Sequence, residues 1–225
     1  SCYTEEVKKL KKSHSSKYAR FRLLLITWKP ILPWLFFGAI AGIYAHNLTH
    51  DIYSGDIGDL VTAAYVFGVA HPPGYPLFTF LGFLFSHLPL SLPVVTKVAL
   101  ISYFSSLLSL ILYYRFAFKI SRNMFLSLLP TSILAFSYLF WFHAEIPEAF
   151  GLNNLFAVSL LYLSYLFLTD KSSKYLYLLA FICGLSLTHH QTILFLFPGI
   201  GLMLLKHFKF IFLHPKRLLT SLLAF

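Results

Sequence analysis

Charged residues are scarce in this chain, at 12% of 225 residues against about a quarter in a typical soluble domain. Cysteine is rarer still, and because Cys2 and Cys183 are far apart, the sequence offers neither a disulfide framework nor a zinc pattern. The composition excludes disorder and a collagen-like chain. Internal repeats and low-complexity segments are absent, and the missing repeats argue against the repeat architecture of many transporters. Hydrophobic residues make up 58% of the chain, in long runs separated by short polar clusters. This composition excludes a soluble enzyme and predicts an all-α, polytopic integral membrane helix bundle.

About six apolar runs are expected to span the membrane. They cover residues 23–45, 94–114, 124–142, 149–168, 175–187 and 193–205. Helical spacing of apolar residues also predicts a short outer-surface helix after Asp59 that ends at Gly68. Residues 76–87 are too few to cross, since a helix of that length reaches only ~18 Å of the ~30 Å hydrocarbon core. We therefore expect residues 76–87 to lie at the outer surface or to dip into it.

Positive charge is concentrated ahead of the first apolar run. Lys and Arg total 18 against 8 Asp and Glu, and eight of the basic residues precede Pro30. The positive-inside rule then places residues 1–22 in the cytoplasm as a basic tail, followed by a multi-span domain over residues 23–225. Further basic clusters within 115–122, 171–174 and 206–217 are expected on the same side. A nucleic-acid partner is discounted because the tail continues directly into an apolar helix, so membrane lipid is its expected partner.

Two aspartates in the polar stretch after the first run are three residues apart. If the short helix extends back by one turn, Asp56 and Asp59 share one face of it. In one interpretation, one carboxylate caps the helix and the other is solvated. In the other, the pair forms a general base with an orienting or metal-binding neighbour. The spacing alone does not choose between these interpretations.

A stiff segment, His-Pro-Pro-Gly-Tyr-Pro, follows at residues 71–76. Its three prolines fix φ and restrict the residues that precede them, so His71 is held in place. That imidazole can bind a phosphate or simply hydrogen-bond a carbonyl. Glu148 lies at the start of an apolar run, where an ionised carboxylate is costly unless it is paired or wet. It is either a functional acid or an interfacial residue at a helix end.

These stretches resemble a membrane family of C-class (GT-C) glycosyltransferases that includes the transmembrane protein O-mannosyltransferases. Asp-Ile-Gly-Asp at 56–59 is similar to the family's Asp-x-Gly-Glu, and His-Pro-Pro-Gly-Tyr-Pro-Leu-Phe follows at 71–78. Residues 144–153 are similar to the family's Ala-x-x-Glu-Val-Tyr-x-Leu-Asn, with Ala-Phe after Glu148 in place of Val-Tyr. Gly-Leu-Ser-Leu at 184–187 leads into a polar His and Gln cluster, as it does in the family. The matches come in family order over most of the chain.

The resemblance implies an enzyme that moves a sugar, such as mannose, from a polyprenyl-phosphate donor to a hydroxyl of a protein, lipid or glycan. The transfer would invert the anomeric centre on the outer or lumenal side of a plasma (inner) membrane or an endoplasmic reticulum membrane. Such chemistry needs a carboxylate to deprotonate the hydroxyl and a donor or cation to stabilise the departing phosphate. Asp56 is the expected base, and Asp59 is expected to orient it or to hold the acceptor. The expected substrate-binding residues are His71, Glu148, His189 and His190.

Some alternatives stay open at this point. A divalent metal is possible, but no ligand spacing specifies one, so no metal site is assigned. A transporter would also place acids and histidines within a bundle, and it predicts solute flux without glycosylated product. A non-catalytic membrane scaffold predicts that Asp56 can be replaced without consequence. Because the chain begins without Met and stops inside an apolar run, we expect it to be a piece of a longer protein.

Overall fold

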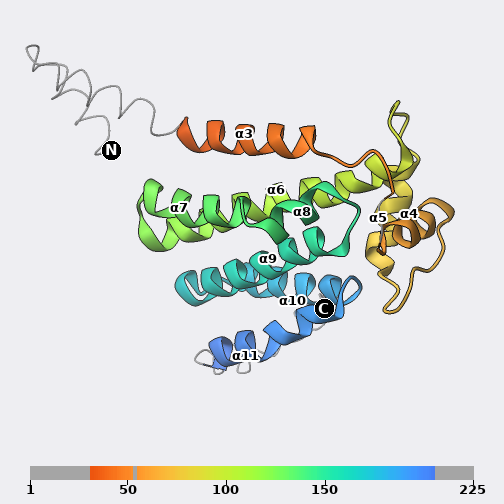
Figure 1. Ribbon diagram of the computed structural model, residues 1–225. Helices are drawn as coiled ribbons and strands as arrows, with labels where there is room; N and C mark the ends of the chain where they lie inside the picture. Colours follow the sequence, from red (N-terminus) through yellow and green to blue (C-terminus); the bar gives the residue numbers. More distant parts are fainter. Residues whose placement is uncertain (1–30, 53–54, 206–225) are drawn as a thin grey trace, which may run out of the picture. The chain divides into compact units, whose positions relative to one another are not determined.

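A computed structural model describes residues 31–52 and 55–205 of the chain (Figure 1). The basic tail expected at 1–22, the first part of the apolar run expected at 23–45 and the basic cluster expected at 206–217 lie outside the described residues. The chain divides at Gly42 into two units. Helix α3 (Leu32–His46) begins in the first unit, and the packing and the site described below belong to the second unit, which begins at Ile43.

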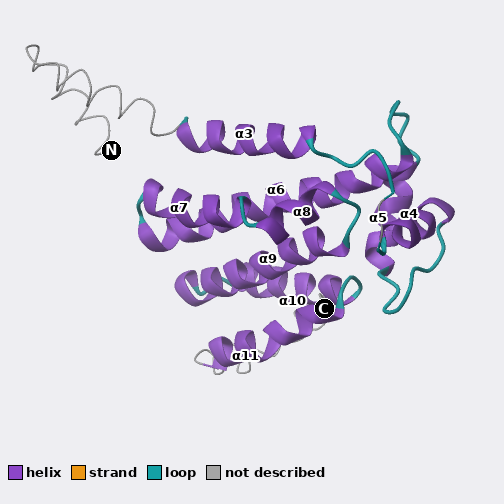
Figure 2. Cartoon of the chain, in the orientation of Figure 1, coloured by secondary structure: helices purple, strands orange, loops and turns teal. Residues whose placement is uncertain are grey.

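Helices joined by loops and turns make up the described residues, which contain no β-strand (Figure 2), and this confirms the all-α prediction. In chain order the elements are α3 (Leu32–His46), α4 (Ile57–Val66), α5 (Pro76–Ser86), α6 (Val94–Ser121), α7 (Met124–Ala135), α8 (Tyr138–Glu145), α9 (Ala149–Asp170), α10 (Ser173–Leu187), the 3₁₀-helix η1 (Gln191–Leu196) and α11 (Phe197–Leu205).

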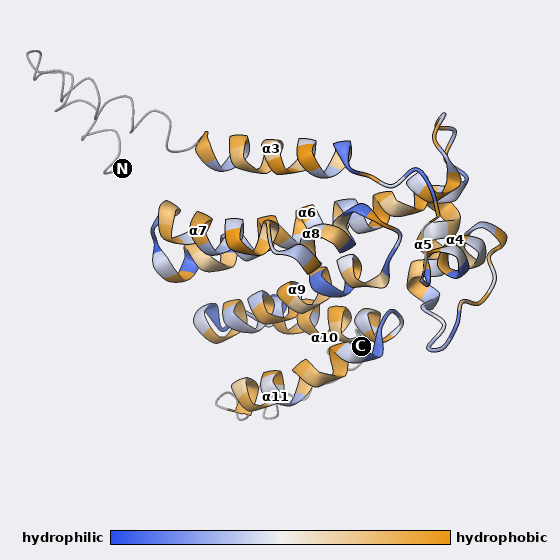
Figure 3. Ribbon diagram, in the orientation of Figure 1, coloured by the Kyte–Doolittle hydropathy of each residue, from blue (hydrophilic) through white to orange (hydrophobic). Residues whose placement is uncertain are grey.

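Two of these helices are long and apolar enough to cross a membrane: α6 with 28 residues and α9 with 22. The pair α7 and α8 makes a third candidate if it is counted as one broken span. Hydrophobic residues dominate the helices and hydrophilic residues gather at the connections (Figure 3). The apolar helices indicate an integral membrane protein with two or three candidate spans in its described part.

The helix α6 differs from the prediction at its C-terminal end. The predicted span stops at residue 114, with a basic loop over 115–122, but α6 continues to Ser121 and ends at Arg122 in the left-handed conformation. No Gly or Pro interrupts residues 115–121, so nothing breaks the helix there. At ~42 Å the helix exceeds the ~30 Å hydrocarbon core, and its last turns can hold Arg115 and Lys119 beyond the lipid.

The span predicted over residues 124–142 is not one continuous helix, because it is broken into α7 and α8 with a bend of 67°. The break is stabilised by hydrogen bonds that replace the lost helical ones. The Tyr44 hydroxyl donates to the Ala135 carbonyl at 2.6 Å, and the Ser137 hydroxyl donates to the Leu134 carbonyl at 2.8 Å. Backbone groups at membrane depth need such partners, and a distant tyrosine is not visible in the local sequence pattern.

The last two apolar runs, expected at 175–187 and 193–205, form shorter elements than a span requires. Helix α10 has 15 residues, and the final run begins as the six-residue 3₁₀-helix η1 before it continues as α11. Helix α5 (Pro76–Ser86) has 11 residues, so its length agrees with the short segment predicted over residues 76–87.

Helices α6 and α9 pack side by side and run parallel (Figure 1). At their N-terminal ends the Ser102 hydroxyl donates to the Glu148 carbonyl at 3.0 Å, and at their C-terminal ends Lys119 Nζ lies 3.9 Å from Asp170 Oδ1. The two ends of the pair are therefore chemically distinct.

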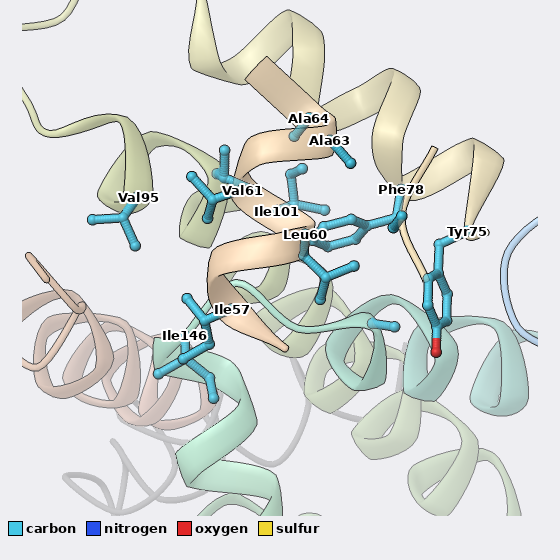
Figure 4. Packing of buried hydrophobic residues seen from close by; sticks show 13 residues of the cluster. Ile57, Leu60, Val61, Ala63, Ala64, Tyr75, Phe78, Val95, Ile101 and Ile146 are labelled. Carbon is cyan, nitrogen blue, oxygen red and sulfur yellow. The ribbon is translucent and has the colours of Figure 1, made fainter. Parts of the chain in front are cut away.

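A buried apolar cluster joins α4 and α5 to the N-terminal part of α6 (Figure 4). Its members include Leu60 and Ala64 of α4, Phe78 of α5 and Val98 of α6, each at most 1% exposed. Gly82 of α5 permits the close approach, since a Cβ there would lie 2.6 Å from the Ala64 Cβ. This packing holds α4 and α5 at the Ser102 end of the α6 and α9 pair.

Candidate active site

Helix α4 begins one turn earlier than predicted, at Ile57, and Asp56 takes its N-cap position. The Asp56 side chain makes no capping hydrogen bond and is 63% exposed. Its carboxylate is therefore not used by the helix. Asp59 follows in the first helical turn, so the two aspartates lie one turn apart, as the spacing predicted. The helix ends at Phe67, which adopts the left-handed conformation in place of the expected Gly68.

The Asp59 carboxylate holds His71 by two hydrogen bonds. Asp59 Oδ2 accepts from the His71 backbone N–H at 2.8 Å and lies 2.7 Å from His71 Nδ1. The backbone bond, followed by the side-chain bond, lowers the pKa of Asp59. An ionised Asp59 therefore fixes both the position of His71 and the orientation of its ring.

The other imidazole nitrogen of His71 faces the second aspartate. His71 Nε2 lies 3.5 Å from Asp56 Oδ2, so the ring stands between the two carboxylates. Because Asp59 occupies Nδ1, only Nε2 is directed toward Asp56. With the hydrogen of the neutral ring on Nδ1, Nε2 can accept a proton from Asp56, and a ring protonated at both nitrogens can orient the Asp56 carboxylate.

The segment after His71 is anchored to the far end of the described chain. Its Pro72–Pro73 peptide bond is cis, and Gly74 and Tyr75 both have positive φ, of 94° and 44°. The Leu77 backbone N–H, in the first turn of α5, then donates to the Thr188 carbonyl at 3.0 Å. This bond joins the first motif stretch to the third across more than a hundred residues.

Glu148 is the N-cap residue of α9. Its backbone N–H donates to the Ser102 hydroxyl at 3.2 Å, while its carbonyl accepts from the same hydroxyl. Burial raises the pKa of Glu148, and the negative charge of Asp56 raises it further, whereas the Ala149 N–H and His71 oppose the rise. Glu148 therefore lies within electrostatic range of Asp56.

The two adjacent histidines at 189 and 190 differ in environment. His189 is 1% exposed, and its Nε2 donates to the Ala149 carbonyl at 2.8 Å. Its Nδ1 is buried with no hydrogen-bond partner in residues 31–52 and 55–205. Burial lowers the pKa of His189 to about 4, so its ring is neutral at physiological pH.

The His190 ring is partly exposed, and its Nδ1 caps η1 by accepting the Thr192 backbone N–H at 3.1 Å. Because Nδ1 accepts, the hydrogen of the neutral ring lies on Nε2. Burial lowers the pKa of His190 as well, which favours this neutral form. The Nε2–H of His190 is thus a hydrogen-bond donor that takes no part in the capping bond, which Nδ1 makes.

Two residues at this site were not singled out from the sequence. Ser102 joins α6 to Glu148, and Tyr75 stands among three histidines, with ring centroids 5.3 Å from His71 and 5.5 Å from His190. Tyr75 lies inside the proline-rich motif, so its position was a usable signal. No signal in the sequence pointed to Ser102, because a serine within an apolar helix is common.

No three His, Cys, Asp or Glu side chains are placed to hold one metal ion within the described part of the chain. His71 and Asp59, the nearest pair of potential ligands, bond to each other.

Comparison with known proteins shows a match between this chain and one protein family. The family described as "Protein O-mannosyl-transferase TMEM260 N-terminal domain" matches residues 56–211. The chain is 34% identical to "Protein O-mannosyl-transferase tmem260" of Dictyostelium discoideum over 67% of its own length and 20% of the relative's. It is 36% identical to "Protein O-mannosyl-transferase TMEM260" of Mus musculus over 76% of its length and 25% of the relative's. The chain thus spans a fifth to a quarter of these curated relatives, and no solved structure matches it.

Proposed function

The chain belongs to the family of the protein O-mannosyl-transferase TMEM260 N-terminal domain, and on that premise we propose that it transfers mannose to a protein hydroxyl. The proposed donor is a polyprenyl-phosphate mannose, and the transfer inverts the anomeric centre. The names of the relatives support the sugar and the protein acceptor. The polyprenyl-phosphate donor rests on the resemblance in the sequence motifs.

The observation that carries this proposal is the meeting of three stretches that are far apart in sequence. Asp59 bonds His71 within the first, Leu77 bonds Thr188 between the first and third, and His189 bonds Ala149 between the third and second. A carboxylate without a capping bond, a partly exposed imidazole and a half-buried acid are thereby gathered at one end of α6 and α9. General-base catalysis next to an anionic leaving group needs this kind of set.

We assign the roles as follows. Asp56 accepts the proton of the incoming hydroxyl as its oxygen bonds to the anomeric carbon, and the bond from that carbon to the phosphate oxygen breaks with its electrons. Polyprenyl phosphate leaves, and the His190 Nε2–H stabilises its charge. Asp59 positions His71, and His71 orients Asp56 through Nε2. His189 holds the start of α9 and therefore positions Glu148, which contacts the substrate.

The finer topology is part of the same proposal. We propose about six spans over residues 23–225, a cytoplasmic tail at 1–22, and a site on the outer or lumenal side of a plasma or endoplasmic reticulum membrane. Ser102 and Lys119, at the two polar ends of the helix pair, are ~26 Å apart along α6, close to the thickness of a bilayer core. The basic residues at the Lys119 end support a cytoplasmic position for that end.

The test is the substitution Asp56→Asn in membranes from cells that express the protein. Radiolabelled polyprenyl-phosphate mannose and a serine- and threonine-rich peptide would be the substrates. Loss of the base should reduce transfer at least ~10²-fold. The matched control is Asp51→Asn, because Asp51 is an exposed aspartate on the same connection that is outside the cluster.

Undiminished transfer by Asp56→Asn would remove Asp56 as the base. Solute flux that depends on Asp56, without mannosylated product, would favour a transporter instead.

A further inference from the structure

Tyr75 has a backbone conformation that is costly for its residue type. With φ 44° and ψ 53° it lies in the left-handed region, which residues other than Gly, Asn and Asp seldom adopt. Strain of this kind persists where the surroundings impose it, and it is frequent at ligand-binding sites. At Tyr75 it sets the direction of the side chain at the N-terminus of α5.

The ring of Tyr75 is enclosed by the histidines of two motif stretches. Its centroid lies 5.3 Å from that of His71, 5.5 Å from that of His190 and 6.4 Å from that of His189. The residue is 8% exposed, so the ring has little freedom to move. The packing fixes where the hydroxyl points.

The hydroxyl itself is not used by the fold. Within residues 31–52 and 55–205 it forms no hydrogen bond, and Figure 4 shows it directed away from Leu60 and Phe78 of the apolar cluster. Burial raises the pKa of Tyr75, and the charges of Asp56 and Glu148 raise it further. The hydroxyl therefore stays protonated at physiological pH and lies within electrostatic reach of both carboxylates.

A neutral donor is what an anionic substrate needs in this position. Asp56 and Glu148 repel a phosphate, and hydrogen-bond donors beside them offset that repulsion. The ring of Tyr75 lies beside the ring of His190, with centroids 5.5 Å apart, and the Nε2–H of His190 is a second neutral donor of the cluster.

We propose that the Tyr75 hydroxyl donates a hydrogen bond to the phosphate of the polyprenyl-phosphate sugar, next to His190. This inference rests on the proposed transferase function and adds a substrate-contacting residue to it. The phenol supplies a hydrogen bond without transferring its proton. It therefore binds the donor before the reaction and the polyprenyl phosphate after it.

The test is Tyr75→Phe, which keeps the enclosed ring and removes only the hydroxyl. Transfer should fall about 10- to 100-fold, the range for loss of a hydrogen bond to a charged group. Inhibition by added polyprenyl phosphate should weaken by a similar factor, while the KM for the acceptor peptide stays the same. The matched control is Tyr65→Phe, since Tyr65 lies on the neighbouring α4 and stacks on His87 at 5.2 Å instead.

Two outcomes would overturn the inference. Wild-type transfer by Tyr75→Phe would show that the hydroxyl contacts nothing of consequence. Reduced transfer with unchanged inhibition by polyprenyl phosphate would place the hydroxyl on the sugar or the acceptor. Either result leaves the proposed function intact as long as Asp56→Asn abolishes transfer, so the two failures can be told apart.

Discussion

The two ends of the α6 and α9 pair are built differently. At the Ser102 end, Ser102 bonds Glu148, His189 bonds Ala149, and α4 and α5 pack onto α6 through a buried apolar cluster. At the other end, Lys119 and Asp170 form a long ion pair, with side chains 32% and 39% exposed.

The two ends differ in how closely the positions of their polar side chains are fixed. Several polar groups at the Ser102 end are buried or half-buried, among them Glu148 and His189, and their hydrogen-bond partners come from distant parts of the chain. Lys119 and Asp170 at the other end are partly exposed, and a long ion pair between such side chains contributes little to stability. We infer that the Ser102 end tolerates far less change, and three experiments test this inference in order of expected effect.

The largest effect is expected from Gly151→Ala in the first turn of α9. A Cβ there would lie 3.0 Å from both the Cα and the carbonyl oxygen of Ser102, and backbone atoms cannot yield cheaply. Overpacking of this kind costs about 1–3 kcal/mol. The apparent melting temperature in detergent should fall, and transfer with it, because Glu148 is displaced from Ser102.

The same substitution at Gly201 in α11 is the control. A Cβ at Gly201 meets nothing within 4 Å, so alanine should raise stability by up to about 1 kcal/mol through its helix propensity. Equal effects at Gly151 and Gly201 would contradict the tight packing at the Ser102 end.

The second effect is a pH dependence of stability that arises from His189. The pKa of His189 is lowered from 6.5 to about 4, so the unfolded chain binds a proton in that interval and the folded chain does not. The free energy of unfolding is therefore unaffected by this titration above pH 6.5, and it decreases as the pH falls from 6.5 toward 4. Between pH 7.5 and 5 the loss should be about 2 kcal/mol.

His189→Gln keeps an N–H for the Ala149 carbonyl and cannot titrate. Melting temperatures measured across this pH range should fall less steeply for His189→Gln than for the wild type. The exposed His46 provides the control, since His46→Gln should leave the slope unchanged. An identical slope in the wild type and His189→Gln would show that His189 does not govern the pH response.

The smallest effect is expected at the other end, from Lys119→Gln or Asp170→Asn. Their charged atoms are 3.9 Å apart and the side chains are partly exposed, so the pair should contribute less than about 0.5 kcal/mol. A double-mutant cycle on melting temperature would measure the coupling. A coupling above about 1 kcal/mol, or a loss of transfer, would remove the contrast between the two ends.

Several features of this protein were predictable from the sequence because they depend on local pattern. The scarcity of charge and the apolar runs indicated membrane helices, and the Asp56 to Asp59 spacing predicted a shared helix face, which α4 confirms. The family resemblance was confirmed by the match over residues 56–211. The roles proposed for Asp56, His71 and the other site residues stay predictions.

Other features could not be predicted because they depend on distant partners. The bend between α7 and α8 is stabilised by Tyr44, which precedes Ala135 by 91 residues. The spacing of Asp59 and His71 gave no sign that one would bond the other through both backbone and ring, since that contact requires the chain to turn back after Gly68. The sequence also left adjacent His189 and His190 equivalent, and only packing distinguishes them.

The amino-acid sequence by itself determined that this protein is helical and belongs in a membrane, since both follow from composition and from the period of apolar residues along short stretches. Only the tertiary structure decided which polar groups meet, because a buried donor or acceptor takes whatever partner the packed helices bring within about 3 Å. That is why Asp59 is committed to His71 while Asp56, one turn earlier, has no capping bond to the helix.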